Sequence, residues 1–290
     1  DGHSSGLAQG KKIVIEDDIV TEITADEVSE ENFDEVFDGT GMVAMPGMTD
    51  AHVHMGCLFA KGEFPVDYAT VLTVAKCKNA LMAGFTTFRD AGSVSEGLKL
   101  AFDEGVLPGP RIYPCGAYIS QTCGHGDSEY AHTYRDIQYR HPSSTVLADG
   151  VPEIIRAVRE QFYRGASHIK LMATEILNRH EDIRLLFGTD MMITGPDYQV
   201  EQSEDIRYYE KRFGTMRALR ALTGTANEVF ALTTYQNPYP KGKIGVLEAG
   251  SYADLLLVDG DPTKSVSVLA DTDHLRLIMK GGTVYKNTLC

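Results

Sequence analysis

Short apolar runs separated by glycine and acidic clusters occupy both ends of this chain. They cover residues 11–46 at the start and residues 242–287 at the end, where Gly281 and Gly282 stand between two alternating runs. Runs of this kind are typical of small antiparallel strands joined by tight turns. The pattern predicts one β-sandwich subdomain built from both chain ends, over residues 1–45 and 241–290.

The pattern changes to alternating strands and helices between residues 46 and 240. The periodicity predicts strands over 48–55, 85–92, 111–120, 168–174 and 183–190, and helices over 66–83, 93–105, 151–166 and 205–224. Repeated units of strand followed by helix indicate a parallel sheet. We therefore predict an α/β domain over residues 46–240, with its sheet either open or closed into a barrel.

Composition and charge narrow the range of partners. The 290 residues carry a formal net charge of −14 with 23% charged residues, which opposes binding to nucleic acid or anionic membranes. No apolar run approaches the roughly 18 residues of a membrane span, so we expect a soluble protein. The five cysteines lack the spacing of a disulfide framework, so we expect free thiols and a cytoplasmic location. The first residues read DGHSSG, and a removed signal peptide with a periplasmic or secreted location remains the alternative.

Two histidines lie one residue apart in the predicted strand MTDAHVHM. Side chains at positions i and i+2 of a strand point to the same face, so His52 and His54 can bind one metal ion together. A bare pair of this kind is more often two unrelated histidines of the core or surface. Further residues are needed to favour the metal interpretation.

Two such residues follow along the chain. Asp190 ends the apolar run RLLFGTD, and a carboxylate at the C-terminal tip of a parallel strand lies where barrel enzymes place catalytic groups. Lys170 lies inside the apolar run HIKLMAT, where an ammonium group needs a partner or a modification. The competing interpretations are a turn or helix cap for Asp190 and a salt bridge with Glu175 for Lys170.

These residues, in this order, resemble the metal-dependent amidohydrolase superfamily. The resemblance also covers MPGMTDAHVHM, GFTTFRDAG, GASHIKLMAT, LLFGTD and GVLEAGSYADLLLVDGDP, and it is closest to the imidazolonepropionase-like, prolidase-type branch with its Xaa-Pro dipeptidases and ochratoxin amidases. It implies a (β/α)8 TIM-like barrel, a β-sandwich and two divalent metal ions, expected to be zinc. It further implies that His52, His54 and Asp190 are metal ligands and that carbamylated Lys170 bridges both ions. Asp50 lies two residues before His52, so its side chain should point to the same face of the strand, and it is expected to orient one of the histidines.

The sequence departs from the family after Lys170. The family places two more histidine ligands before its final aspartate, but only nineteen residues separate Lys170 from Asp190 here, with His180 as the sole histidine. A full barrel needs roughly 250 residues, so we predict that a segment of roughly a hundred residues is missing between Lys170 and Asp190. We place the junction near residues 175–178. Whether the protein or only this sequence lacks the two ligands stays open.

The resemblance predicts a hydrolase that cleaves a carbon–nitrogen amide bond of a small N-acyl amino acid or dipeptide. A metal-bound hydroxide would attack the carbonyl, and Asp190 would act as the catalytic acid and base. His125, in the glycine-flanked loop QTCGHGDSE, is a candidate substrate-binding residue, with a plain flexible loop as the competing interpretation. The alternatives are a cyclic-amide hydrolase, a deaminase, or a non-catalytic barrel scaffold with an incomplete metal site. We also expect a homo-oligomer.

Overall fold

The computed structural model describes most of the chain. The described residues are 1–3, 6–55, 66–92, 94, 96–124, 126–127, 145–171, 184–192 and 198–289. The predicted substrate-binding residue His125, the predicted junction at residues 175–178 and His180 lie outside them.

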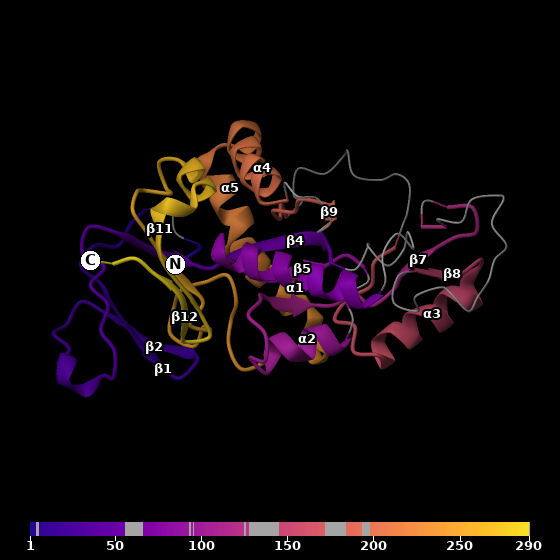
Figure 1. Ribbon diagram of the computed structural model, residues 1–290, viewed down its shortest axis with the longest axis horizontal. Helices are drawn as coiled ribbons and strands as arrows, with labels where there is room; N and C mark the ends of the chain where they lie inside the picture. The colour runs from indigo at the N-terminus through magenta and orange to yellow at the C-terminus, as the bar shows by residue number, and fades with distance from the viewer. Residues whose placement is uncertain are drawn as a thin grey trace.

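Strands and helices alternate along the middle of the described chain, and strands dominate its two ends (Figure 1). The strands are β1 Lys12–Glu16, β2 Ile19–Thr24, β3 Val43–Pro46, β4 Met48–His54, β5 Phe85–Asp90, β6 Arg111–Tyr113, β7 Tyr118–Ser120, β8 Thr145–Leu147, β9 Met191–Met192, β10 Leu255–Val258, β11 Leu275–Lys280 and β12 Thr283–Asn287. The α-helices are α1 Val66–Met82, α2 Glu96–Asp103, α3 Val151–Tyr163, α4 Tyr198–Phe213, α5 Thr215–Leu222 and α6 Gly224–Phe230. Short 3-10 helices are η1 Glu30–Asn32, η4 Ala231–Gln236, η5 Val266–Ala270 and η6 Thr272–His274.

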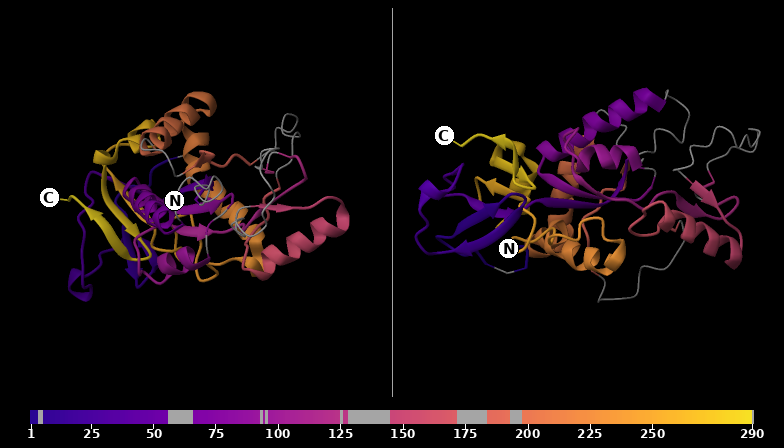
Figure 2. Two further views of the ribbon diagram at one scale, coloured as in Figure 1. Left: turned by 45° about the vertical axis from the view of Figure 1, so that its right-hand side comes forward. Right: turned by 90° about the horizontal axis from the view of Figure 1, so that it is seen from below.

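The two chain ends share one antiparallel sheet. Its strand order is β12-β11-β10-β3, so β3 from the N-terminal part pairs with β10 from the C-terminal part. The β1-β2 hairpin contributes Val20 to a hydrophobic cluster that also contains Leu255, Leu257 and Leu277 of that sheet. Figures 1 and 2 show the indigo and yellow strands side by side at one end of the molecule. The boundaries at residues 45 and 241 remain predictions.

Parallel strands form the middle of the molecule. A four-stranded sheet has the order β6-β5-β4-β9, and β7 pairs in parallel with β8. In this order β4 lies between the next strand of the chain and the last strand of the domain, as the first strand of a barrel would. The α/β content is as predicted. Within the described ranges the two sheets do not join into a closed ring, so barrel closure remains a prediction.

Two of the predicted elements are divided at a glycine with a positive φ. The single helix predicted over residues 205–224 is instead two helices, α4 and α5, because Gly214 has a φ of 81° and ends the first of them. The strand predicted over 111–120 is divided into β6 and β7 by the segment from Pro114 to Gly116, whose glycine has a φ of 69°. Proline removes a ladder donor and the positive φ turns the chain. The strand predicted over 183–190 begins only at Met191 among the described residues.

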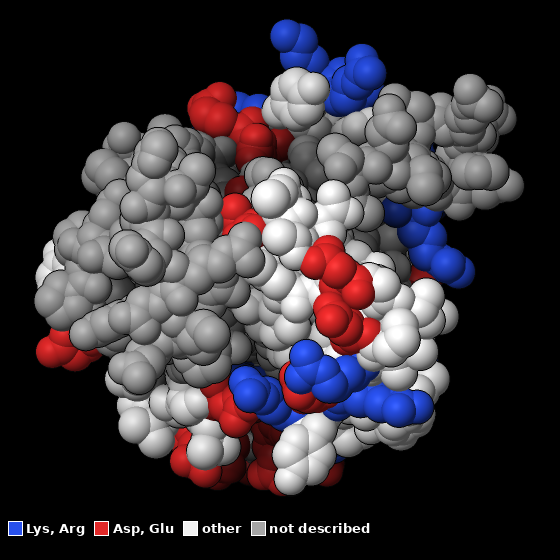
Figure 3. Space-filling view, turned by 90° about the vertical axis from the view of Figure 1, so that its right-hand side faces the viewer, with Lys and Arg blue, Asp and Glu red and all other residues white. Residues whose placement is uncertain are grey.

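Among the described residues, no helix combines the length and the apolar character that crossing a bilayer requires. Figure 3 views the end of the molecule with β7, β8 and α3, where acidic and basic side chains lie next to one another. The cytoplasmic location and the homo-oligomeric state remain predictions.

Candidate metal centre

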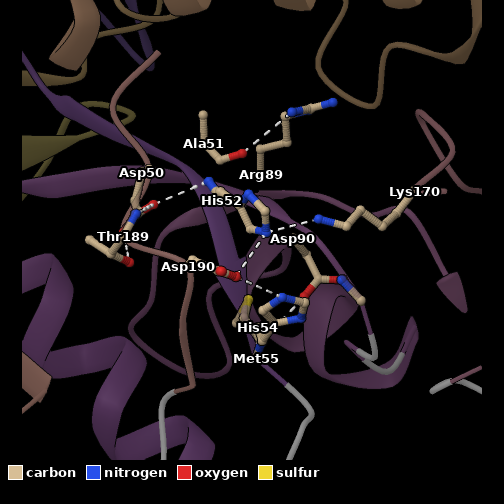
Figure 4. Close-up of polar contacts among 12 residues, drawn as sticks. Asp50, Ala51, His52, His54, Met55, Arg89, Asp90, Lys170, Thr189 and Asp190 are labelled. Carbon is tan, nitrogen blue, oxygen red and sulfur yellow. Dashed lines mark hydrogen bonds and ion pairs between the residues drawn. The ribbon is translucent and has the colours of Figure 1, made fainter. Parts of the chain in front are cut away.

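The two strand histidines lie on one face of β4, as their spacing predicts (Figure 4). The His52 and His54 ring centroids are 5.4 Å apart. The side chain of His54 is buried at 9% exposure, whereas that of His52 is 36% exposed. One imidazole is therefore fixed in the core and the other faces the open side of the sheet.

Asp190 lies between these two imidazoles. Its Oδ1 is 3.0 Å from His52 Nε2 and 3.2 Å from His54 Nε2. The backbone holds it there: the Asp190 amide donates to the His52 carbonyl at 2.8 Å, and Met191 and Met192 then pair with β4. Asp190 has a φ of 55°, a left-handed conformation that costs free energy in a non-glycine residue and often marks a functional position.

A glycine lets the Asp190 segment approach β4 this closely. A Cβ atom added to Gly188 would lie 2.8 Å from the Cβ of His52 and 3.2 Å from its amide nitrogen. Any larger side chain would push the segment away from the strand, so the run Gly188-Thr189-Asp190 needs its glycine for contact rather than for flexibility.

Lys170 approaches from the other side of His52. Its Nζ lies 2.9 Å from His52 Nε2, and its carbonyl accepts the Ile119 amide of β7 at 2.9 Å. Burial lowers the pKa of the Lys170 amine, and the nearby Asp190 carboxylate partly opposes that effect. The structure therefore brings together the four residues that the sequence predicts as metal ligands, although His52 and Lys170 are 118 positions apart.

The donor atoms fit a divalent cation. The ligand atoms of His52, His54 and Asp190 all lie within 4.8 Å of one another. Around one tetrahedral zinc ion, with bonds of about 2.0 Å, neighbouring ligand atoms lie about 3.3 Å apart, close to the observed 3.0 and 3.2 Å. Burial, together with the nearby Lys170 charge, lowers the pKa of His52 to about 4, so its imidazole is neutral at pH 7 and offers a lone pair. Two imidazoles and one carboxylate form a donor set typical of zinc and related ions.

Asp50 has a different role from the one that its place on the histidine face of β4 predicts. Its buried carboxylate accepts the His52 backbone amide at 3.2 Å, the Thr189 amide at 3.3 Å and the Thr189 hydroxyl at 2.9 Å. It also accepts the Gln202 side-chain amide of α4 at 3.1 Å. The expectation that Asp50 orients a histidine ring is therefore wrong, because its oxygens face the backbone and the Asp190 segment. The sequence pattern points to neither Thr189 nor Gln202.

Arg89 and Asp90 support the site from β5. An ion pair between them, the simplest interpretation of adjacent opposite charges, does not form: Arg89 donates to the Ala51 carbonyl, while Asp90 accepts the amides of Met55, Gly92 and Val94. Adjacent strand residues point to opposite faces, which separates the two side chains. Asp90 thus fixes the end of β4 just after His54.

The stability contribution of Asp90 should depend on pH. Burial raises the pKa of this carboxyl from its ordinary 3.8 to about 7, because the three backbone donors only partly compensate for the loss of water. Between those values the folded protein holds a proton that the unfolded chain has released, so stability falls as pH rises through the window. Asp90→Asn cannot ionise. We expect its free energy of unfolding, relative to the native protein, to rise by about 4 kcal/mol between pH 4 and 7 and then to level off.

Urea unfolding of both proteins at several pH values checks this. The asparagine amide faces three backbone donors, which adds a penalty that is the same at every pH. Only the slope of the difference is therefore diagnostic, and a difference that stays constant from pH 4 to 7 would contradict the expected ionisation of Asp90.

Comparison with known proteins adds to this geometry. The profile of the amidohydrolase family matches residues 43–183, which include His52, His54 and Lys170. This profile covers just under half of the chain, and over that part the chain is similar to the amidohydrolase family. An ochratoxinase from Aspergillus niger is 34% identical over 152 residues, which cover 46% of this chain and 31% of that enzyme. The aligned part therefore spans about a third of the length of this amidohydrolase relative.

Solved amidohydrolase structures share the fold. One crystal structure of an amidohydrolase has a TM-score of 0.85 at 23% identity, covering 100% of this chain and 97% of the other. A prolidase complexed with N-methylphosphonate-L-proline has a TM-score of 0.74 at 20% identity, covering 96% and 95%. The two TM-scores show a shared fold with mixed α/β content, of the TIM-like kind, and at such low identities they show the fold alone.

Proposed function

We propose that this chain is a metal-dependent amidohydrolase that cleaves a carbon–nitrogen amide bond in a small N-acyl amino acid or dipeptide. The observation that carries the proposal is the convergence of His52 Nε2, His54 Nε2 and Asp190 Oδ1, with Lys170 Nζ beside them. Four groups from three distant parts of the chain meet at one point. The Asp190 side chain is 72% exposed, so its position adds little to the stability of the fold and leaves the carboxylate open to a ligand.

His52, His54 and Asp190 would hold one divalent ion, and a carbamylated Lys170 would link it to a second. A bound zinc ion supplies Lewis acidity, which lowers the pKa of water from 15.7 to roughly 7 and polarises a carbonyl. Lys170 can be modified because burial favours its neutral amine, the form that reacts with carbon dioxide. Carbamylation would turn a half-buried cation into an anionic oxygen ligand.

Asp190 is suited to move the proton in this reaction. Its carboxylate is exposed to the open side of the site, while its backbone is fixed by the His52 carbonyl. It would accept the proton released when water attacks the amide carbonyl and return it to the leaving nitrogen. An amine leaves poorly unless it is protonated, so both transfers fall to the same group.

The substrate class rests on the relatives. The Aspergillus niger relative is named an ochratoxinase, and one structural neighbour is a prolidase that holds a phosphonate analogue with a proline end. Both names point to amide bonds next to an amino-acid carboxylate. We therefore propose N-acyl amino acids and Xaa-Pro dipeptides as the first compounds to test, ahead of a cyclic amide or a deamination substrate.

A second candidate is a metal-binding barrel scaffold without turnover. Within the described residues, metal-ligating side chains cluster at one place only, and that cluster contains three of them. A two-metal site needs more ligands than His52, His54, Asp190 and a modified Lys170 provide. If the segment between Lys170 and Asp190 is as short in the cell as it is here, binding without catalysis follows.

Metal analysis with intact mass, followed by a substrate panel, separates these candidates. We expect zinc in the purified protein, a mass increase of one carbon dioxide on Lys170 after gentle preparation, and release of free amino acid from part of the panel. A chain with His52 and His54 both replaced by alanine is the matched control and should lose metal and turnover together. Metal without turnover on every compound would favour the scaffold, and absence of metal would refute both.

A further inference from the structure

A buried carboxylate in β4, two residues before His52, holds the segment that carries Asp190. Asp50 is fully buried in β4. It accepts four hydrogen bonds, two of them from Thr189, the residue directly before Asp190, and one from Gln202 of α4. These partners are 139 and 152 positions away in the chain. One carboxylate thus joins β4, the Asp190 segment and a helix.

This arrangement fixes Asp190 from both sides. On one side Thr189 is bound through its amide and its hydroxyl to Asp50; on the other, the Asp190 amide donates to the His52 carbonyl. The left-handed backbone of Asp190, with its φ of 55°, is a conformation that persists only when the surroundings enforce it. Figure 4 shows Asp50 and Thr189 on one side of β4 and the two imidazoles with Asp190 beyond them.

Burial of the Asp50 carboxylate carries a free-energy cost that hydrogen-bond donors must offset. A fully buried carboxylate loses its hydration, and only a complete set of donors compensates for that loss. Asp50 obtains its donors from the His52 backbone amide of β4, from Thr189 and from Gln202 of α4, and its oxygens do not contact either imidazole ring. Its hydrogen bonds therefore act on the position of Asp190 and not on the histidines' orientation.

We propose that Asp50 is a positioning residue that acts through Thr189 to place the Asp190 carboxylate against His52 and His54 for metal binding. The inference rests on the proposed metal site and is independent of whether the protein hydrolyses anything. Thr189 supplies the connection, and Gln202 donates to Oδ2 of Asp50, the oxygen that also accepts the Thr189 hydroxyl.

Cobalt(II) binding to the full chain tests this, because cobalt absorbs visible light in a way that reports its ligands. The variants are Asp50→Asn and Thr189→Val. We expect each to weaken cobalt affinity by about 10- to 100-fold, as is usual when the partner of a metal ligand is lost. Each should also change the cobalt spectrum toward that of Asp190→Asn, which a general loss of stability would not do.

Two further variants serve as controls. Thr49→Val makes the same hydroxyl-to-methyl change at a fully buried position of β4 next to Asp50, and it should leave the spectrum and affinity unchanged. Thr189→Ser keeps the hydroxyl and should retain native affinity. If Asp50→Asn does not fold, Thr189→Val and Thr189→Ser carry the test alone.

A double-mutant comparison decides whether Asp50 acts through Asp190. Asp50→Asn should weaken cobalt binding in the native background and have little further effect when Asp190 is already alanine, which offers no ligand oxygen to position. Equal losses in both backgrounds would overturn the inference, as would native spectra for Thr189→Val. A native chain that binds no cobalt would overturn it too, whereas a chain that binds cobalt without hydrolysing any substrate would refute only the proposed function.

Discussion

Replacing Asp190 with asparagine should lower the rate of amide hydrolysis by roughly 100- to 10,000-fold, while the protein still binds zinc at saturating concentration. Asparagine has nearly the same shape and keeps an oxygen close to His52 and His54, which lie 3.0 and 3.2 Å from the native carboxylate oxygen. The amide cannot accept a proton near neutral pH. Attack on the substrate and departure of the amine would both lose their proton carrier.

The measurement is the turnover number at saturating zinc on the best compound of the substrate panel, with bound zinc measured in the same samples. Asp273→Asn removes an exposed carboxylate in η6 and is the matched control, expected to keep native turnover. Near-native turnover of Asp190→Asn at full zinc occupancy would refute the assignment of proton transfer to this residue. Loss of zinc at every concentration would show instead that Asp190 is needed chiefly as a ligand.

Replacing Phe187 with alanine should lower the free energy of unfolding by about 3–5 kcal/mol. The Phe187 ring is fully buried in the main hydrophobic cluster, with ring centroids 5.7 Å from Phe85 and 4.8 Å from Tyr209. Its backbone accepts the Ala51 amide and donates to the Ala221 carbonyl, so it also anchors the segment that leads to Asp190. Alanine would leave a cavity between the sheet and α4.

Urea unfolding at fixed pH measures this change. Leu232→Ala removes an aliphatic side chain that is 66% exposed, and it should change stability by no more than about 0.5 kcal/mol. Phe187→Leu, which refills much of the cavity, should cost less than Phe187→Ala. A loss below about 1 kcal/mol for Phe187→Ala would mean that the core under the site relaxes around the gap and that Phe187 does not anchor the Asp190 segment.

Much of the local structure follows from the sequence because its causes are local. The helix predicted over residues 66–83 is α1, Val66–Met82, and the hairpin predicted around Gly281 and Gly282 is formed by β11 and β12. The spacing of His52 and His54 places both on one face of β4 for the same reason: side-chain direction in a strand repeats every two residues. Local periodicity determines these features without any tertiary contact.

Predictions that treat a long apolar pattern as one element are less accurate. The amphipathic pattern over residues 205–224 continues across Gly214, but the backbone turns there and two helices result. A pattern of apolar positions cannot show whether a glycine inside it keeps helical geometry or adopts a positive φ. The packing of the two helices on their neighbours makes that choice.

The sequence alone determined the chemistry available at the site: two imidazoles on one strand face, an amine in an apolar run and a late carboxylate. Only the tertiary structure decided how these groups meet, because His52 and Lys170 come together across 118 positions, and Asp50 finds Thr189 and Gln202 across 139 and 152. Side-chain type and local spacing are properties of short segments, and the sequence displays them. Contacts between distant segments depend on which strands become neighbours, and that is settled by the packing of the whole chain.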